Sequence, residues 1–194
     1  MNLPNKLTIA RVIAVPFFIA AFYLGWYAVA FVIFIAASFT DMLDGQIARK
    51  NNLVTNFGKI MDPLADKVLV YSALCLMIPY LVPAWMLIII LAREFTVAGM
   101  RTVAASEGIG IAAIREAHQH FVGQRVHYIA AGMSGKIKTV LQMIAVCLLL
   151  LVPAFPFFIP LWYASQAFLW ASLIMTVYSG VEYVWKNRQV FSIK

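Results

Sequence analysis

Residues 12–40 have the sequence VIAVPFFIAAFYLGWYAVAFVIFIAASFT, a stretch without a single charged side chain. It is longer than the roughly 7–15 apolar residues of a cleavable signal peptide. It is also longer than the about 20 residues that one helix needs to cross a bilayer. Gly25 and Trp26 lie near its middle and indicate a turn. The stretch therefore predicts two retained membrane helices joined by a short turn.

The rest of the chain has the same character. Hydrophobic residues make up 63% of the 194 residues and charged residues only 12%, whereas an ordinary soluble domain has about 25% charged residues. Prolines near 79–83 and 153–160 divide the two later apolar runs. We therefore expect an all-α integral membrane protein, one domain over 1–194, with six transmembrane helices. The predicted spans are 8–24, 27–48, 59–79, 84–106, 135–152 and 161–184.

The positive charges predict the orientation of these spans. Every Lys and Arg lies in a terminal segment, in the 49–59 or 102–135 connection, or in an adjoining half of a span. The connections near 25, 81 and 156 have none. By the positive-inside rule both termini and the two charged connections face the cytoplasm. The net charge of +7 suits a protein surface near anionic lipid headgroups. Nucleic acid is disfavoured as a partner, because the sequence has no soluble basic segment with interleaved aromatic residues.

Four aspartates lie toward this cytoplasmic side. The segment 41–49 is Asp-Met-Leu-Asp-Gly-Gln-Ile-Ala-Arg, and helical periodicity places 41, 44, 45, 48 and 49 on one stripe. Asp62 and Asp66 follow at i, i+4 spacing. Clustered carboxylates near a bilayer are costly unless they bind cations, and hard oxygen ligands favour Mg²⁺, Mn²⁺ or Ca²⁺. The set suits two-metal catalysis at phosphorus.

Simpler roles for these aspartates compete with metal binding. Each could cap a helix or pair with Arg49, Lys59 or Lys67, and Asp62 before Pro63 fits an N-cap followed by the first helical position. Four aspartates on two adjacent helix ends, with small residues at regular offsets, favour the metal site. Gly45 and Ala48 leave room for a bulky group, and Arg49 offers a planar fork for phosphate.

The pattern Asp-x2-Asp-Gly-x2-Ala-Arg-x8-Gly-x3-Asp-x3-Asp over 41–66 resembles the signature of the CDP-alcohol phosphatidyltransferase family. The resemblance implies an enzyme in which four aspartates hold two Mg²⁺ or Mn²⁺ ions, with Asp66 also the catalytic general base. The implied metal ligands are Asp41, Asp44, Asp62 and Asp66. The implied contacts to the CDP group are Asn5, Asp41, Gly45, Ala48, Arg49 and Thr55.

Four cations are candidates for binding a phosphate on the acceptor substrate: Arg93, Arg101, Lys136 and Lys138. Arg93 and Arg101 lie within about 80° of one another on a helix, and such cations suit an anionic substrate. Alternatively, Arg93 neutralises Glu94 or an aspartate, and the lysines only mark the cytoplasmic side.

Most of the chain resembles bacterial family members that convert CDP-diacylglycerol and sn-glycerol 3-phosphate into phosphatidylglycerol phosphate and CMP. The resemblance implies an enzyme of the cytoplasmic membrane, and enzymes of this kind are commonly homodimers.

Other functions compete with this one. A sister transferase would use inositol phosphate, serine or phosphatidylglycerol as acceptor. A divalent-cation transporter would also use acids within the membrane, but it would need polar residues toward both faces, and the outer connections here are apolar. A non-catalytic scaffold leaves the aspartates unexplained.

One segment departs from the family pattern. Ile-Ala-Ala occurs at 111–113 and again at 129–131, and 114–131 resembles a cytoplasmic insertion, natural or introduced, that contains all three histidines. His118, His120 and Glu116 suggest a metal site, but a polar helix or loop is the favoured interpretation because surface connections tolerate additions.

Overall fold

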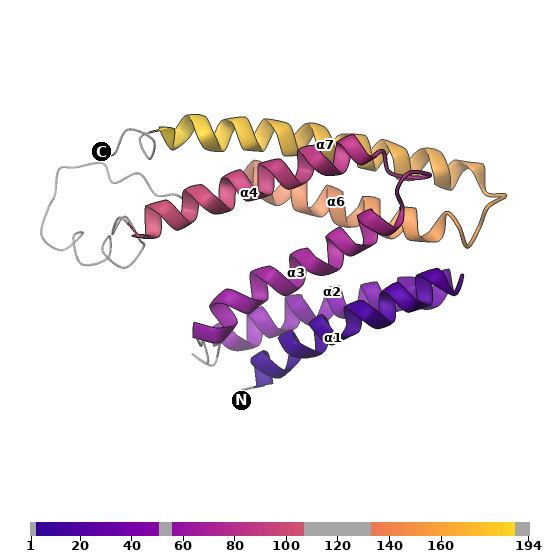
Figure 1. The fold of residues 1–194 in the computed structure, drawn as a ribbon, viewed down its shortest axis with the longest axis horizontal. Coiled ribbons are helices and arrows are strands. Elements are labelled where there is room, and N and C mark those ends of the chain that lie inside the picture. The colour runs from indigo at the N-terminus through magenta and orange to yellow at the C-terminus, as the bar shows by residue number, and fades with distance from the viewer. Residues whose placement is uncertain (1–2, 51–55, 107–132, 189–194) are drawn as a thin grey trace, which may run out of the picture. The chain divides into compact units, whose positions relative to one another are not determined.

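The computed structural model describes residues 3–50, 56–106 and 133–188 (Figure 1), without the side chains of 3–6, 41–50, 56–60, 62, 63, 66 and 104–106. Within these residues the chain is all-helical and contains no strand. The helices are α1 (Leu3–Tyr23), α2 (Tyr27–Lys50), α3 (Asn56–Leu76), α4 (Ala84–Ser106), α6 (Met133–Leu151) and α7 (Ile159–Lys186). Each of the six predicted spans corresponds to one of these helices.

The turns lie where glycine and proline predict them. Gly25 has a φ of 75°, a left-handed conformation that glycine adopts without a Cβ penalty. The backbone N–H of Trp26 donates to the carbonyl of Ala21 at 2.9 Å and so closes the end of α1. The predicted breaks at Pro79, Pro83, Pro153 and Pro156 also fall between helices, whereas Pro160 lies in the first turn of α7.

The third helix begins earlier than the predicted span. The sequence left open whether Pro63 starts this helix or lies within it. In the structure α3 begins at Asn56, so Pro63 lies inside it and Asp62 is not its N-cap.

Among the described residues, α6 and α7 are the two helices long and apolar enough to cross a membrane by length and composition. Large apolar side chains on α7 face outward, including Ile174 at 64% and Val181 at 62% exposure. An extended apolar exterior of this kind is typical of contact with lipid or with another apolar surface.

The described chain divides into two compact units. The first comprises Met1–Ala84 and Gln142–Trp170. Within it α1 packs against α2 and α3, and the fully buried rings of Phe18 and Phe34 lie 6.1 Å apart between centroids. The side-chain amide of Gln166 donates to the carbonyl of Leu81 at 2.9 Å and fixes the start of α7 to the connection before α4.

The second unit comprises Trp85–Leu141 and Ala171–Lys194. It contains α4, the first part of α6 and the last part of α7. Val97, Met100 and Tyr183 form a small buried core there, with Val184 packed against it. This unit contains the four candidate cations for the acceptor substrate.

Candidate functional site

The four predicted metal ligands belong to α2 and α3 of the first unit. The N-terminus of α1, the C-terminal end of α2 and the N-terminal end of α3 lie at the same end of this unit (Figure 1). Asp41 and Asp44 belong to the last turns of α2, and Asp62 and Asp66 to the first half of α3.

The side chains of this end lie outside the described residues. This holds for the four aspartates and for Asn5, Gly45, Ala48 and Arg49, while Thr55 and the segment 114–131 lie wholly outside. The side chains that the structure does describe contain no group of three His, Cys, Asp or Glu that would hold a metal ion. The metal and nucleotide assignments remain predictions.

Arg11 is a buried cation close in sequence to this end of α1. It is 2% exposed, and its Nε donates to the carbonyl of Ala37 on α2 at 3.1 Å. Ala37 precedes Asp41 by one helical turn. A charged group within an apolar bundle needs partners, and this one ties α1 to the helix that carries two aspartates. The sequence alone could have indicated this buried cation, because Arg11 is the last charged residue before the uncharged stretch 12–40.

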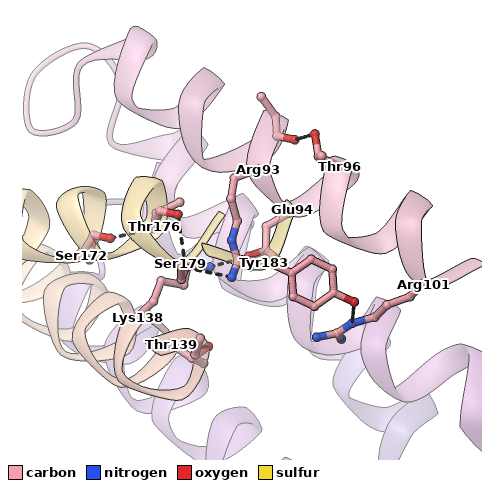
Figure 2. Close-up of polar contacts among 12 residues, drawn as sticks. Arg93, Glu94, Thr96, Arg101, Lys138, Thr139, Ser172, Thr176, Ser179 and Tyr183 are labelled. Atoms are coloured by element: carbon pink, nitrogen blue, oxygen red, sulfur yellow. Dashed lines mark hydrogen bonds and ion pairs between the residues drawn. The ribbon is translucent and has the colours of Figure 1, made fainter. Parts of the chain in front are cut away.

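The second unit brings two of the four candidate cations together on one carboxylate. Glu94 Oε1 lies 2.8 Å from Arg93 Nη1 and 2.6 Å from Lys138 Nζ (Figure 2). The side chains of Arg93, Glu94 and Lys138 are 14%, 12% and 5% exposed. We call these three residues the basic cluster. The formal charge of these three side chains together is +1.

The guanidinium of Arg93 is held from α7 as well. Its Nη2 donates to the Ser179 hydroxyl at 2.9 Å (Figure 2). Its Nε is buried and has no hydrogen-bond partner among the described residues. A buried donor without a partner is costly, so the arrangement has one donor available for a further acceptor.

The other two candidate cations lie elsewhere. Arg101 Nε donates to the Tyr183 hydroxyl at 3.3 Å (Figure 2), and its guanidinium carbon lies 5.5 Å from the centroid of the same ring. Lys136 is exposed and lies two positions before buried Lys138, so the two lysines point to nearly opposite sides of α6. The four cations therefore do not form one cluster in this structure.

Polar residues of α7 were missing from the sequence prediction. They recur at helical spacing in an otherwise apolar helix, and they are buried: Ser172, Thr176, Ser179 and Tyr183. The 3.6-residue period of this polar stripe is the signal that indicates a buried polar face. Glu94 appeared in the prediction only as a neutralising partner for Arg93, and it is the centre of the basic cluster.

A cavity of about 490 Å³ borders Arg93 within the second unit. Its walls are mainly apolar and come from α4 and α7. The lining residues are Ile89, Arg93, Thr96, Val97, Val177, Gly180, Val181, Val184, Trp185 and Arg188.

The described residues form only helices, two of them long and apolar enough to cross a bilayer, and they contain a buried basic cluster. The chain belongs to the CDP-alcohol phosphatidyltransferase family, whose sequence model matches residues 1–178. Enzymes of this family generally depend on a divalent metal.

Relatives cover nearly the whole chain. A CDP-diacylglycerol–glycerol-3-phosphate 3-phosphatidyltransferase of Bacillus subtilis (strain 168) is 43% identical, with 96% of this chain and 95% of the relative aligned. An enzyme of the same name from Rickettsia felis is 36% identical over 98% of this chain and 97% of its own length. A probable phosphatidylglycerophosphate synthase of Mycobacterium tuberculosis is 35% identical over 94% and 80%.

Proposed function

We propose that this chain transfers the phosphatidyl group of CDP-diacylglycerol to sn-glycerol 3-phosphate, giving phosphatidylglycerol phosphate and CMP. The observation that carries the proposal is 43% identity over 96% of the chain to a relative named for this reaction. The basic cluster of the second unit supports the choice of a phosphorylated acceptor.

The acceptor phosphate would bind at Arg93 and Lys138. Both are held in place by Glu94, and the free Nε–H of Arg93 supplies a donor for a phosphate oxygen. A phosphate dianion would compensate the excess positive charge of the cluster, and charge-assisted hydrogen bonds are about twice as strong as neutral ones. Arg101 and Lys136 would add attraction at greater distance.

The donor would bind at the charged ends of α1, α2 and α3. Four carboxylates on two neighbouring helices form an all-oxygen donor set, which fits Mg²⁺ or Mn²⁺. We assign Asp41, Asp44, Asp62 and Asp66 as the ligands of two ions, which when bound would neutralise the diphosphate of CDP-diacylglycerol. Asn5, Gly45, Ala48, Arg49 and Thr55, together with Asp41, would contact the CDP group.

The chemical step would be a substitution at the phosphorus that carries diacylglycerol. The Asp66 carboxylate would accept the proton of the glycerol 1-hydroxyl, and that oxygen would form the new P–O bond. The bond between this phosphorus and the CMP oxygen would break, and CMP would leave with the electron pair beside the Arg49 guanidinium. Positioning and charge neutralisation would supply most of the rate acceleration.

The membrane arrangement belongs to the same proposal. All six helices would cross the bacterial cytoplasmic membrane as one domain over 1–194, with both termini and the active site on the cytoplasmic side. The complete one-sided distribution of Lys and Arg supports this topology. Cysteines introduced one at a time near 25, 81 and 156 should react with an impermeant thiol reagent from outside intact cells, and cysteines near 5 and 188 should not.

The test of the reaction is CMP release from CDP-diacylglycerol by the purified protein in detergent. We expect release that requires Mg²⁺ or Mn²⁺ and glycerol 3-phosphate, and that stops when a chelator is added. Release only with serine, inositol phosphate or phosphatidylglycerol would retain the family and replace the acceptor. Folded protein that neither binds the nucleotide nor releases CMP would refute the assignment.

A further inference from the structure

Gly180 on α7 lies directly against the side-chain stem of Arg93. A Cβ placed on Gly180 would be 2.8 Å from Arg93 Cγ, 3.8 Å from its Cβ and 3.9 Å from its Cδ. A Cβ contact of 2.8 Å is closer than proteins tolerate, so only a residue without a side chain fits beside this stem in its present position.

The neighbouring residue on α7 holds the other end of the same side chain. Ser179 is 2% exposed, and its hydroxyl accepts a hydrogen bond from Arg93 Nη2 at 2.9 Å while donating to the carbonyl of Thr176 at 3.2 Å. Because its own donor is used in α7, the Ser179 oxygen is oriented to accept. Gly180 therefore admits the stem of Arg93, and Ser179 fixes its guanidinium.

We propose that Gly180 and Ser179 are positioning residues that set the affinity for the acceptor substrate by fixing the guanidinium of Arg93. This inference rests on the proposed function of Arg93 in binding the acceptor phosphate. A methyl group at Gly180 pushes Cγ away, and Arg93 has few directions in which to move because Glu94 and Ser179 hold its two terminal nitrogens.

The cavity beside the stem determines how the protein responds to that push. Both Arg93 and Gly180 line it, so the displaced stem has empty space to enter. The helices need not separate, and alanine is also the better helix former. Gly180→Ala should therefore yield a folded protein in which the guanidinium is misplaced.

The experiment measures KM for each substrate separately in Gly180→Ala. A misplacement of about 1 Å costs up to about a hundredfold, so we expect KM for glycerol 3-phosphate to rise by about tenfold or more. KM for CDP-diacylglycerol should stay within about twofold, because the donor residues lie on other helices. The matched control is Gly99→Ala on α4, where an added Cβ meets nothing within 4 Å, and both KM values should then match the unmodified protein.

A second variant tests the same arrangement without adding an atom. Ser179→Ala removes the acceptor for Arg93 Nη2, and it too should raise KM for glycerol 3-phosphate alone. The inference would be overturned if KM for glycerol 3-phosphate is unchanged in both variants, or if KM rises equally for both substrates. If Gly180→Ala does not fold, the result for Ser179→Ala decides alone. An assay of the unmodified protein tests the proposed function independently. If its CMP release does not need glycerol 3-phosphate, the proposed function itself is refuted.

Discussion

Lys138 on α6 and Glu94 on α4 form a buried ion pair of 2.6 Å, although they are 44 positions apart in the chain. The same carboxylate oxygen contacts Arg93 at 2.8 Å. One carboxylate thus holds two cations from different helices in a region shielded from water. Ion pairs in such a setting are weak net contributors to stability, but they become costly when one partner is removed.

The first prediction follows from removing that carboxylate. Glu94→Gln removes the carboxylate charge that pairs with both Arg93 and Lys138, and breaking a buried pair in this way costs about 3–5 kcal/mol. The thermal midpoint of the variant in detergent should fall clearly. Glycerol 3-phosphate should raise the midpoint more than it does in the unmodified protein, because its phosphate replaces the missing negative charge.

The matched control for this variant is Glu182→Gln. Glu182 also pairs with a lysine, Lys186 at 2.5 Å, but that lysine side chain is 68% exposed. Exposed pairs of this kind contribute little, so the midpoint should change much less and should not respond to glycerol 3-phosphate. Equal shifts in the two variants would contradict a special role for Glu94.

The second prediction separates two lysines that the sequence treats alike. Lys138 is 4% exposed and belongs to the basic cluster, whereas Lys136 is exposed. A hydrogen bond to a charged group contributes about 1.5–3 kcal/mol, so Lys138→Ala should lower kcat/KM for glycerol 3-phosphate by about tenfold to a hundredfold. Lys136→Ala should lower it by only a small factor. A larger loss in Lys136→Ala would show that the cluster is not the phosphate site.

The fold was largely predictable from the sequence because a bilayer allows few solutions. Uncharged runs interrupted by Gly25 and by the prolines at 79–83 and 153–160 give six helices close to those of the structure. The start of α3 was the main uncertainty. Proline is favoured at the first position of a helix, which indicates a start near Pro63, whereas α3 begins at Asn56 and includes this proline.

The grouping of the cations was only partly predictable. Arg93 and Arg101 share a face of one helix, which periodicity reveals, and Glu94 is the neighbour of Arg93 in the sequence. Their other partners, Ser179, Tyr183 and Lys138, reach α4 only by packing between helices far apart in sequence. The requirement for glycine at 180 depends on where the stem of Arg93 lies, which no pattern along α7 alone can indicate.

The third prediction concerns the contact between Arg101 and Tyr183. The Nε to hydroxyl distance of 3.3 Å is long for a hydrogen bond, whereas the guanidinium lies 5.5 Å from the ring centroid, within cation–π range. Tyr183→Phe keeps the ring, so KM for glycerol 3-phosphate should change by less than about threefold, equivalent to ~0.5 kcal/mol. Tyr183→Leu removes the ring and should raise KM further. A large effect of Tyr183→Phe would mean that the hydroxyl itself contacts substrate.

The fourth prediction concerns Arg11, whose Nε is bonded to the carbonyl of Ala37. A buried hydrogen bond to a charged group contributes about 1.5–3 kcal/mol, so Arg11→Met should lower the thermal midpoint. Measured well below that midpoint, CMP release should also fall about tenfold or more, because the connection from α1 to the turn before Asp41 is gone and catalysis is sensitive to small displacements.

The control for Arg11→Met is Arg188→Met. Arg188 is exposed and its guanidinium carbon lies 5.7 Å from the ring centroid of Trp185. Its replacement should leave both the midpoint and CMP release nearly unchanged. If folded Arg11→Met, assayed well below its midpoint, releases CMP as fast as the unmodified protein, the role of Arg11 is in stability alone.

The last prediction separates the proposed general base from the other metal ligands. Asp66→Asn keeps the size of the side chain and one ligand oxygen but removes the basic carboxylate, and general base catalysis contributes about 10²–10⁴-fold. Turnover measured by CMP release should therefore fall by that order, while the dissociation constant for CDP-diacylglycerol changes only a few-fold. Asp44→Asn should weaken both donor binding and turnover, because Asp44 is assigned as a metal ligand without a second role. Donor binding that falls equally in the two variants would remove the distinct role of Asp66 and leave all four aspartates as ligands only.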